Sequence, residues 1–184
     1  LEKKIIYAYF NSYRGKSIFL IPIKKISNEM VANKWIANLN IKSDYKNNLK
    51  VLLDEEIPIG VYDNGNQKIL FSKNHVILEI LKNNNDYEEL IVFYGQNSIN
   101  KSKELLLSLG DEFIVNIATA HFIQNRRWNI KLNNQILLKL PEKHLKHAII
   151  NFKKIYVNFS NKDLENIESI DLRIKNQAIL KYKK

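Results

Sequence analysis

The chain has 184 residues, 45% of them hydrophobic, which is enough to bury a core in one domain or in two small ones. It contains no Cys, and this excludes disulfides, thiolate metal sites and a Cys nucleophile. Its net charge of +10 favours anionic partners such as nucleic acid, lipid headgroups or acidic proteins, although the lysines are spread along the whole chain as on a solvated surface. No run approaches the roughly 20 consecutive apolar residues of a membrane-spanning helix.

The first sixty residues predict a small α+β unit. Apolar residues recur at helical spacing over residues 1–13 and again over residues 26–32. Residues 17–21 are a short apolar run, which predicts a strand. Residues 34–45 and 49–57 alternate apolar and polar side chains, so they predict a β-hairpin.

Strands dominate the predicted structure of the remaining residues. The strand candidates are residues 59–72, where Asp63-Asn64-Gly65 predicts a tight turn between two strands, residues 75–81, residues 89–95, and a hairpin over residues 126–140. Helices are predicted at residues 102–109 and 142–157. Residues 111–124 fit either a strand or a helix, and residues 160–165 read as a polar link.

The chain is predicted to end on a strand. Ile170, Leu172 and Ile174 alternate with polar residues, and the apolar stretch Ala178-Ile179-Leu180 follows close to the last residue. Little sequence remains to cover the edge of the sheet. Unpaired backbone groups at such an edge can accept a strand from another protein.

Motifs for catalysis are absent from the sequence. It contains no Gly-rich phosphate loop, no Gly-x-Ser-x-Gly and no His-Glu-x-x-His. His144 and His147 could share a metal with Glu142 on the predicted helix, but a polar helix face is the simpler interpretation. The carboxylates of residues 54–56 alternate between the two faces of a strand and are interpreted as a strand-end charge cluster. We therefore expect no enzyme, no cofactor, no metal site and no small-molecule substrate.

Nucleic-acid binding is the alternative that the charge raises. Arg126, Arg127 and Lys131 surround Trp128, a combination that can contact phosphates and stack on bases. Trp128 alternates in phase with residues 130 and 132, which places it in the core by default. We expect no nucleic-acid partner, and a basic nucleic-acid-binding α+β protein stays the alternative.

Several stretches together resemble the bacterial cell-division family FtsQ/DivIB. Residues 126–132 (RRWNIKL) resemble its Arg-Trp-x-Leu-x-Leu hairpin, residues 140–142 (LPE) the tripeptide before its long helix, and residues 170–173 (IDLR) its closing strand. Trp35-Ile36 and residues 55–62 (EEIPIGVY) resemble a strand of its POTRA domain and the exit from that domain. The departures from the family pattern are Lys34, Lys46, Glu56, His75 and Gln135. Because Gly is common at the last two positions, we expect the neighbouring Asn74 and Asn134 to take the left-handed conformation.

The resemblance implies an α+β fold in two domains. Residues 1–57 would be a POTRA-like domain whose first strand precedes Leu1, and residues 58–184 a larger, mostly antiparallel β domain with two helices. It also implies a membrane-spanning helix outside this chain, with this fragment on the periplasmic side of the bacterial inner membrane.

The resemblance further implies a non-enzymatic scaffold that links early and late division proteins. Its last strand would receive FtsB, together with FtsL, by strand addition. The residues implied for partner binding are Arg126, Arg127, Arg173, Ile174, Lys175, Asn176, Gln177, Ala178, Ile179 and Tyr182. Arg173 and either Arg126 or Arg127 are expected to pair with partner carboxylates, and Tyr182 to serve as an aromatic anchor.

Overall fold

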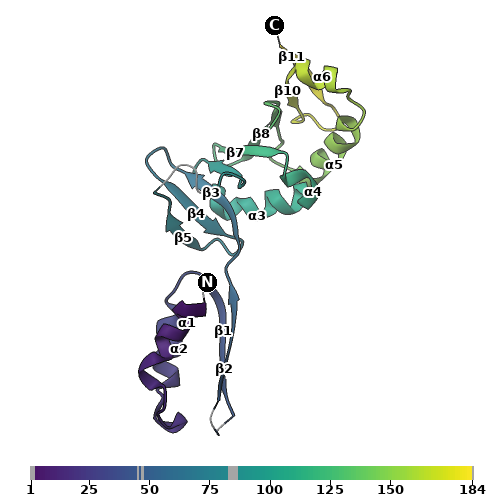
Figure 1. Cartoon of the computed structure of the whole chain (residues 1–184). Helices are drawn as coiled ribbons and strands as arrows, with labels where there is room; N and C mark the ends of the chain where they lie inside the picture. The colour runs from purple at the N-terminus through teal and green to yellow at the C-terminus, as the bar shows by residue number, and fades with distance from the viewer. Residues whose placement is uncertain (1–2, 45, 47, 83–86, 184) are drawn as a thin grey trace. The chain divides into compact units, whose positions relative to one another are not determined.

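The computed structural model describes residues 3–44, 46, 48–82 and 87–183 (Figure 1). The fold is α+β, with a large, mostly antiparallel sheet and several helices. Contacts divide the chain into two compact units. Unit 1 comprises Leu1–Pro58 and Ser72–Leu78, and unit 2 comprises Ile59–Phe71 and Glu79–Lys184. The POTRA-like identity of residues 1–57 stays a prediction.

Unit 1 packs two helices on a β-hairpin. Its elements are α1 (Lys3–Phe10), the 3-10 turns η1 (Asn11–Tyr13) and η2 (Ile18–Leu20), α2 (Ile23–Val31), and the antiparallel strands β1 (Ile36–Ser43) and β2 (Leu49–Glu55). Alternation puts one apolar face of the hairpin towards the helices. The buried core of this unit is Ile26, Met30 and Ile36, with Leu39 and Val51 packed against it.

The predicted strand over residues 17–21 is wrong. Its central residues form η2, where the backbone amides of Leu20 and Ile21 donate to the carbonyls of Ser17 and Ile18 at 2.9 and 3.3 Å. A short apolar run has no period that separates a strand from another structure. Local turn hydrogen bonds satisfy this backbone, so it needs no neighbouring strand.

Unit 2 contains most of the large sheet, which has nine strands within the described residues. Their order across the sheet is β11-β10-β9-β8-β7-β6-β3-β4-β5. The strands are β3 (Pro58–Asp63), β4 (Lys68–Ser72), β5 (Ile77–Ile80), β6 (Val92–Tyr94), β7 (Ile117–Ile123), β8 (Arg127–Leu132), β9 (Leu137–Lys139), β10 (Ile167–Asp171) and β11 (Ile179–Tyr182). β7 to β9 form antiparallel pairs, whereas β6 runs parallel to β3 and β7, and β9 runs parallel to β10.

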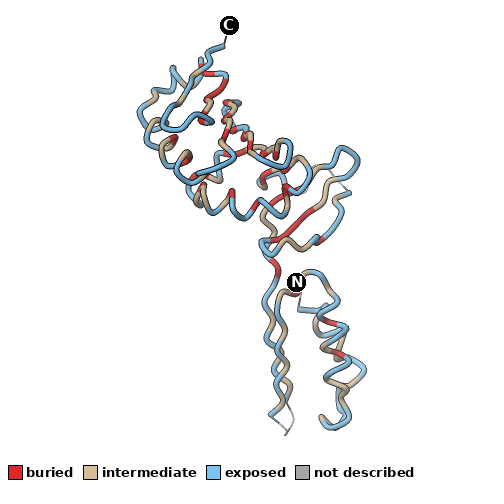
Figure 2. The backbone as a smooth tube through the Cα atoms, turned by 180° about the vertical axis from the view of Figure 1, so that it is seen from behind, coloured by how far each residue is buried: buried red, intermediate tan, exposed pale blue. Residues whose placement is uncertain are grey.

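Helices also contribute to the core of unit 2. These helices are α3 (Ser98–Leu109), α4 (Asp111–Ile114), α5 (Leu145–Tyr156) and α6 (Asn161–Asn166). Leu105 and Leu109 of α3 and Ile149 and Phe152 of α5 are buried in one cluster with the strands. Figure 2 shows the buried residues gathered mainly in the interior of unit 2. No helix in the described part of the chain is long and apolar enough to cross a membrane.

The predicted elements of unit 2 are largely confirmed. Asn64-Gly65 forms the turn between β3 and β4, where Gly65 has φ +88 and its amide donates to the Asp63 carboxylate at 2.8 Å. Residues 111–124 contain both alternatives, because α4 precedes β7. The helix expected at 142–157 begins only at Leu145, and the expected polar link at 160–165 is largely helix α6.

Candidate binding site at the sheet edge

The C-terminal segment forms two strands, and the second is outermost in the sheet. β10 lies between β9 and β11, while β11 pairs with β10 alone among the described strands. The pairing is antiparallel, with Ile179 opposite Asp171 and Leu180 opposite Ile170. One long side of β11 therefore has none of the described strands beside it.

Backbone hydrogen bonds show which amides of β11 face inward. The amide of Leu172 donates to Lys139 of β9 at 2.9 Å, so along β10 the amides of residues 170 and 172 point to β9 and that of Asp171 points to β11. On the other strand, the amide of Lys183 donates to Asn166 at 2.8 Å. Both observations place the backbone groups of residues 179 and 181 towards β10. By alternation, the N–H and C=O of Leu180 and Tyr182 face outward.

The side chains of β11 divide between the core and solvent. Leu180 and the preceding Ala178 are partly buried against the main core cluster. Ile179 and Tyr182 keep 50% and 55% of their surface exposed. Lys181 is held by an ion pair with Glu168 of β10, with a distance of 2.6 Å between Nζ and Oε1. The strand is thus attached to the sheet on one side and offers two large side chains to solvent.

The structure corrects the extent of the predicted edge. Of the ten residues predicted for partner binding, only Ile179 and Tyr182 lie on β11. Residues 173–178 form the connection from β10, because a turn closes from Ile174 to Gln177 with an amide-to-carbonyl distance of 3.1 Å and Asn176 at φ +62. Period-two alternation could not reveal this turn, since it runs on unbroken through Ile174.

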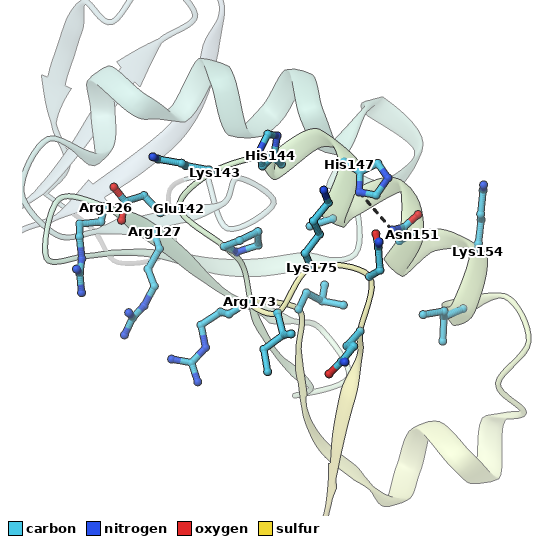
Figure 3. A pocket seen from close by; sticks show the side chains of 17 residues that line it. Arg126, Arg127, Glu142, Lys143, His144, His147, Asn151, Lys154, Arg173 and Lys175 are labelled. Atoms are coloured by element: carbon cyan, nitrogen blue, oxygen red, sulfur yellow. Dashed lines mark hydrogen bonds between the residues drawn. The ribbon is translucent and has the colours of Figure 1, made fainter.

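This connection lines a groove together with one side of α5 and the residues just before that helix (Figure 3). The groove has a volume of about 770 Å³. Its lining includes seven of the predicted residues, namely Arg126, Arg127, Arg173, Ile174, Lys175, Asn176 and Gln177. The β7–β8 connection and the β10–β11 connection, far apart in sequence, thus meet at one site.

The groove is strongly basic. The cationic side chains that line it are Arg126, Arg127, Lys143, Lys154, Arg173 and Lys175. Glu142 is the only acidic side chain among its described lining residues. In Figure 3 the guanidinium groups of Arg126, Arg127 and Arg173 extend to the same side. Such an arrangement favours an acidic ligand.

Arg173 is already paired within the chain. Its Nε lies 2.9 and 3.0 Å from the two carboxylate oxygens of Asp171, and Nη2 lies 2.5 Å from Oδ2. The hydrogen bond from Arg173 lowers the pKa of Asp171, and the same contact raises the pKa of Arg173. The pair fixes the guanidinium in place, and 42% of the Arg173 side chain remains exposed for a further acceptor.

The other two arginines of the groove differ in their partners. Arg126 donates from Nη2 to the side chain of Gln124 at 3.0 Å. The Nε of Arg127 is buried and has no hydrogen-bond partner among the described residues.

The metal alternative does not match the geometry. His144 precedes α5 in a left-handed conformation, with φ +61, so His144 and His147 are not spaced one helical turn apart. His147 instead lies 3.4 Å from the amide nitrogen of Asn151. No cluster of three or more His, Cys, Asp or Glu that could hold a metal occurs among the described residues.

The structure also argues against base stacking on Trp128. Trp128 is only 4% exposed and lies between Phe93 and Phe122, with ring centroids 5.9 and 4.7 Å away. It therefore cannot stack on a nucleic-acid base.

Among the strand-end carboxylates, Glu56 is buried and has a partner within the chain. Glu56 is 7% exposed, and its two oxygens accept from the side-chain amide of Asn74 at 3.1 and 3.2 Å. It ties the connection between β4 and β5 to unit 1 and has a structural role.

Sequence reasoning missed the helix that supports β11. The hydroxyl of Ser160 accepts from the amide of Asp163 at 3.2 Å, and the Asp163 carboxylate accepts from the Ser160 amide at 3.0 Å. This capping box begins α6, whose last residue Asn166 accepts the amide of Lys183. The spacing of Ser160 and Asp163 was the available signal.

Fold and site together define an α+β protein whose sheet ends in an outermost strand beside a basic groove. The sequence profile described as "Cell division protein FtsQ/DivIB, C-terminal" matches residues 60–173. The chain therefore belongs to the FtsQ/DivIB family of cell division proteins, as the resemblance predicted.

Individual relatives are consistent with this assignment. Cell division protein FtsQ of Rickettsia felis is 28% identical over 183 residues, covering 96% of this chain and 66% of the relative. FtsQ of Rhizobium radiobacter is 25% identical, covering 89% of this chain and 78% of the relative. The chain thus spans slightly less than two thirds of the length of the Rickettsia felis relative. The major extracytoplasmic domain of DivIB from Geobacillus stearothermophilus (trans isomer) aligns with a TM-score of 0.43 at 13% identity, covering 58% of this chain and 99% of the other.

Proposed function

We propose that this chain is the periplasmic part of a non-enzymatic division scaffold that binds the FtsB–FtsL pair by strand addition to β11. In this proposal a membrane-spanning helix outside this chain anchors the protein in the bacterial inner membrane, and the bound pair connects early with late division proteins. The observation that carries the proposal is the position of β11 at the margin of the large sheet.

Backbone pairing supplies only part of the expected affinity. Each added hydrogen bond contributes about 0.5–1.5 kcal/mol net, and the outward groups of Leu180 and Tyr182 allow only a few. Side-chain anchors must supply the remaining affinity. Ile179 and Tyr182 are suitably exposed, and the arginines of the groove can pair with carboxylates on the segment that precedes or follows the added strand.

A proline at Leu180 tests the backbone contribution directly. Proline removes the outward N–H and places its ring where the incoming strand would lie, while the inward bonds of residues 179 and 181 remain. Proline at Ile179 would instead remove an inward bond to β10. We expect Leu180→Pro to weaken binding of purified FtsB–FtsL by tenfold or more, on the order of 1.4 kcal/mol.

Leu180→Ala is the matched control, because it removes the same side chain and keeps the amide. It should bind within about threefold of the parent, and circular dichroism of both variants should match the parent. Equal affinities for the Pro and Ala variants would show that the edge of β11 accepts no strand. Tyr182→Ala should also weaken binding of FtsB–FtsL if Tyr182 is an aromatic anchor.

A further inference from the structure

One end of unit 1 combines exposed apolar and basic side chains. The connection between α1 and α2 lies at the same end of this unit as the end of β1 and the start of β2 in both views (Figures 1 and 2). Lys16 and Phe19 from the first segment line one groove with Lys46 and Leu49 from the second, so the two segments are neighbours. We call this end the tip of unit 1.

The apolar part of the tip is η2. Phe19 and Leu20 are consecutive and keep 78% and 71% of their surface exposed. The turn is short and is closed by its own backbone hydrogen bonds. Two adjacent large apolar side chains on a projecting turn are unfavourable in water, and they suit contact with an apolar phase.

The tip is also basic in both segments. Residues 11–24 contain Arg14, Lys16 and Lys24 and no acidic residue. Lys25 follows but is paired with Glu29, at 3.9 Å between Nζ and Oε1. The end of the hairpin contributes Lys42, Lys46 and Lys50.

Two of the hairpin lysines repel each other. Lys42 and Lys50 are paired directly across the strands on the exposed face. Like charges in directly opposite positions destabilise a hairpin, so an anion bound between them would relieve the repulsion.

Asp44 is the acidic residue at this end of the hairpin, and its carboxylate offsets one of these positive charges. Asp44 accepts the backbone amides of Lys46 and Asn48 at 2.8 and 2.9 Å and the side-chain amide of Asn48 at 2.7 Å. Its oxygens hold the hairpin turn together.

We propose that the tip of unit 1 binds an anionic lipid bilayer. Phe19 and Leu20 enter the boundary between headgroups and acyl chains, while the surrounding Lys and Arg side chains meet the lipid phosphates. Basic residues around exposed Phe and Leu are the composition of peripheral membrane-binding surfaces, whereas the cores of protein interfaces are depleted in Lys. The tip belongs to unit 1 and β11 to unit 2, so the proposal does not depend on strand addition.

The absence of Cys allows a direct test of insertion. The variant Phe19→Cys carries a single thiol that can be labelled with an environment-sensitive fluorophore. We expect a blue shift on adding vesicles of phosphatidylglycerol and phosphatidylcholine, and none with phosphatidylcholine alone. Leu107→Cys is the matched control, because Leu107 on α3 is 71% exposed, close to the 78% of Phe19. No shift at residue 19, or equal shifts at both positions, would overturn the proposal.

Vesicle co-sedimentation tests the basic residues. Replacing both Lys42 and Lys50 with Gln should lower the partition coefficient for anionic vesicles by about tenfold or more, since each basic residue near such a surface contributes roughly a fivefold factor. Replacing Lys101 and Lys103 of α3 with Gln removes the same net charge. This control should change the partition coefficient by less than about twofold. Equal losses would show that the whole-chain charge is responsible. Parent-like vesicle binding by the tip variant, combined with lost binding to polyglutamate, would instead indicate an acidic protein partner. Either result overturns the proposal.

Discussion

At the scale of single residues, His75 and Gln135 stand where family members commonly have Gly. They show that residues with side chains can occupy the left-handed conformation at these turns. We expected Asn74 and Asn134 to take the left-handed conformation there, and this is wrong. His75 and Gln135 adopt it themselves, with φ +64 and +72. The Asn residues act through their side chains, because Asn134 donates to the Tyr156 hydroxyl at 3.1 Å and Asn74 donates to Glu56.

This difference predicts opposite effects for two neighbouring substitutions. Gln135→Gly removes the strain of a side chain in the left-handed region, so we expect the free energy of unfolding to rise by about 0.5–1 kcal/mol. Asn134→Gly removes the hydrogen bond to Tyr156 without relieving strain, so we expect the free energy of unfolding of this variant to fall. Urea unfolding of both variants measures the two signs, and a stabilised Asn134→Gly would contradict the assignment.

Asp171 predicts a pH dependence of stability. Its folded-state pKa lies below the ordinary value of 3.8 because Arg173 donates to the carboxylate. The resulting stabilisation is present above pH 3.8 and is lost as the pH falls through the lower, folded-state pKa. We expect Asp171→Asn to lower the free energy of unfolding at pH 7 and to weaken its decrease towards pH 3.

Urea unfolding at the two pH values measures this change. Lys175→Gln, in the same connection, controls for general disturbance of the loop. An Asp171→Asn variant whose stability falls with acid as steeply as that of the parent would show that the pair contributes nothing.

At the scale of elements, the C-terminal strands show why an edge is hard to read from sequence. Ile170 to Lys175 alternates without a break, yet β10 ends at Asp171 and is internal. β11 is only four residues long and follows a turn that Asn176 makes possible. The alternation predicted the buried side chains of Ile170 and Leu172 correctly, but it placed Ile174 on the same strand, where the structure has an exposed residue of the connection. A strand's end and its neighbours are set by residues distant in sequence. Leu180→Pro is therefore expected to act on binding, because the outward direction of that amide follows from the pairing with β10.

At the scale of the whole molecule, the chain does not divide at a single point. Residues 72–78 belong to unit 1, where the amide of Lys73 donates to Ile57 at 2.9 Å and Asn74 donates to Glu56. A fragment of residues 59–184 lacks both acceptors. We expect it to retain protection in β7 and β8, whose side chains lie in the main core, and to exchange amide hydrogens faster at residues 73–76.

Hydrogen exchange followed by mass spectrometry measures this difference. The whole chain is the reference for each peptide. Unchanged exchange at residues 73–76 would show that the preceding segment does not hold this turn in place.

The sequence by itself determined the α+β class, most helices and strands, and the family. Periodic burial and the motifs around Trp128, Pro141 and Leu172 are local properties, so a single chain carries them. The tertiary structure decided that β10 is internal and β11 outermost, that Arg126, Arg127 and Arg173 line one groove, and that Trp128 is enclosed by Phe93 and Phe122. These facts depend on contacts between residues far apart in sequence, where long-range packing and sheet order override local preference.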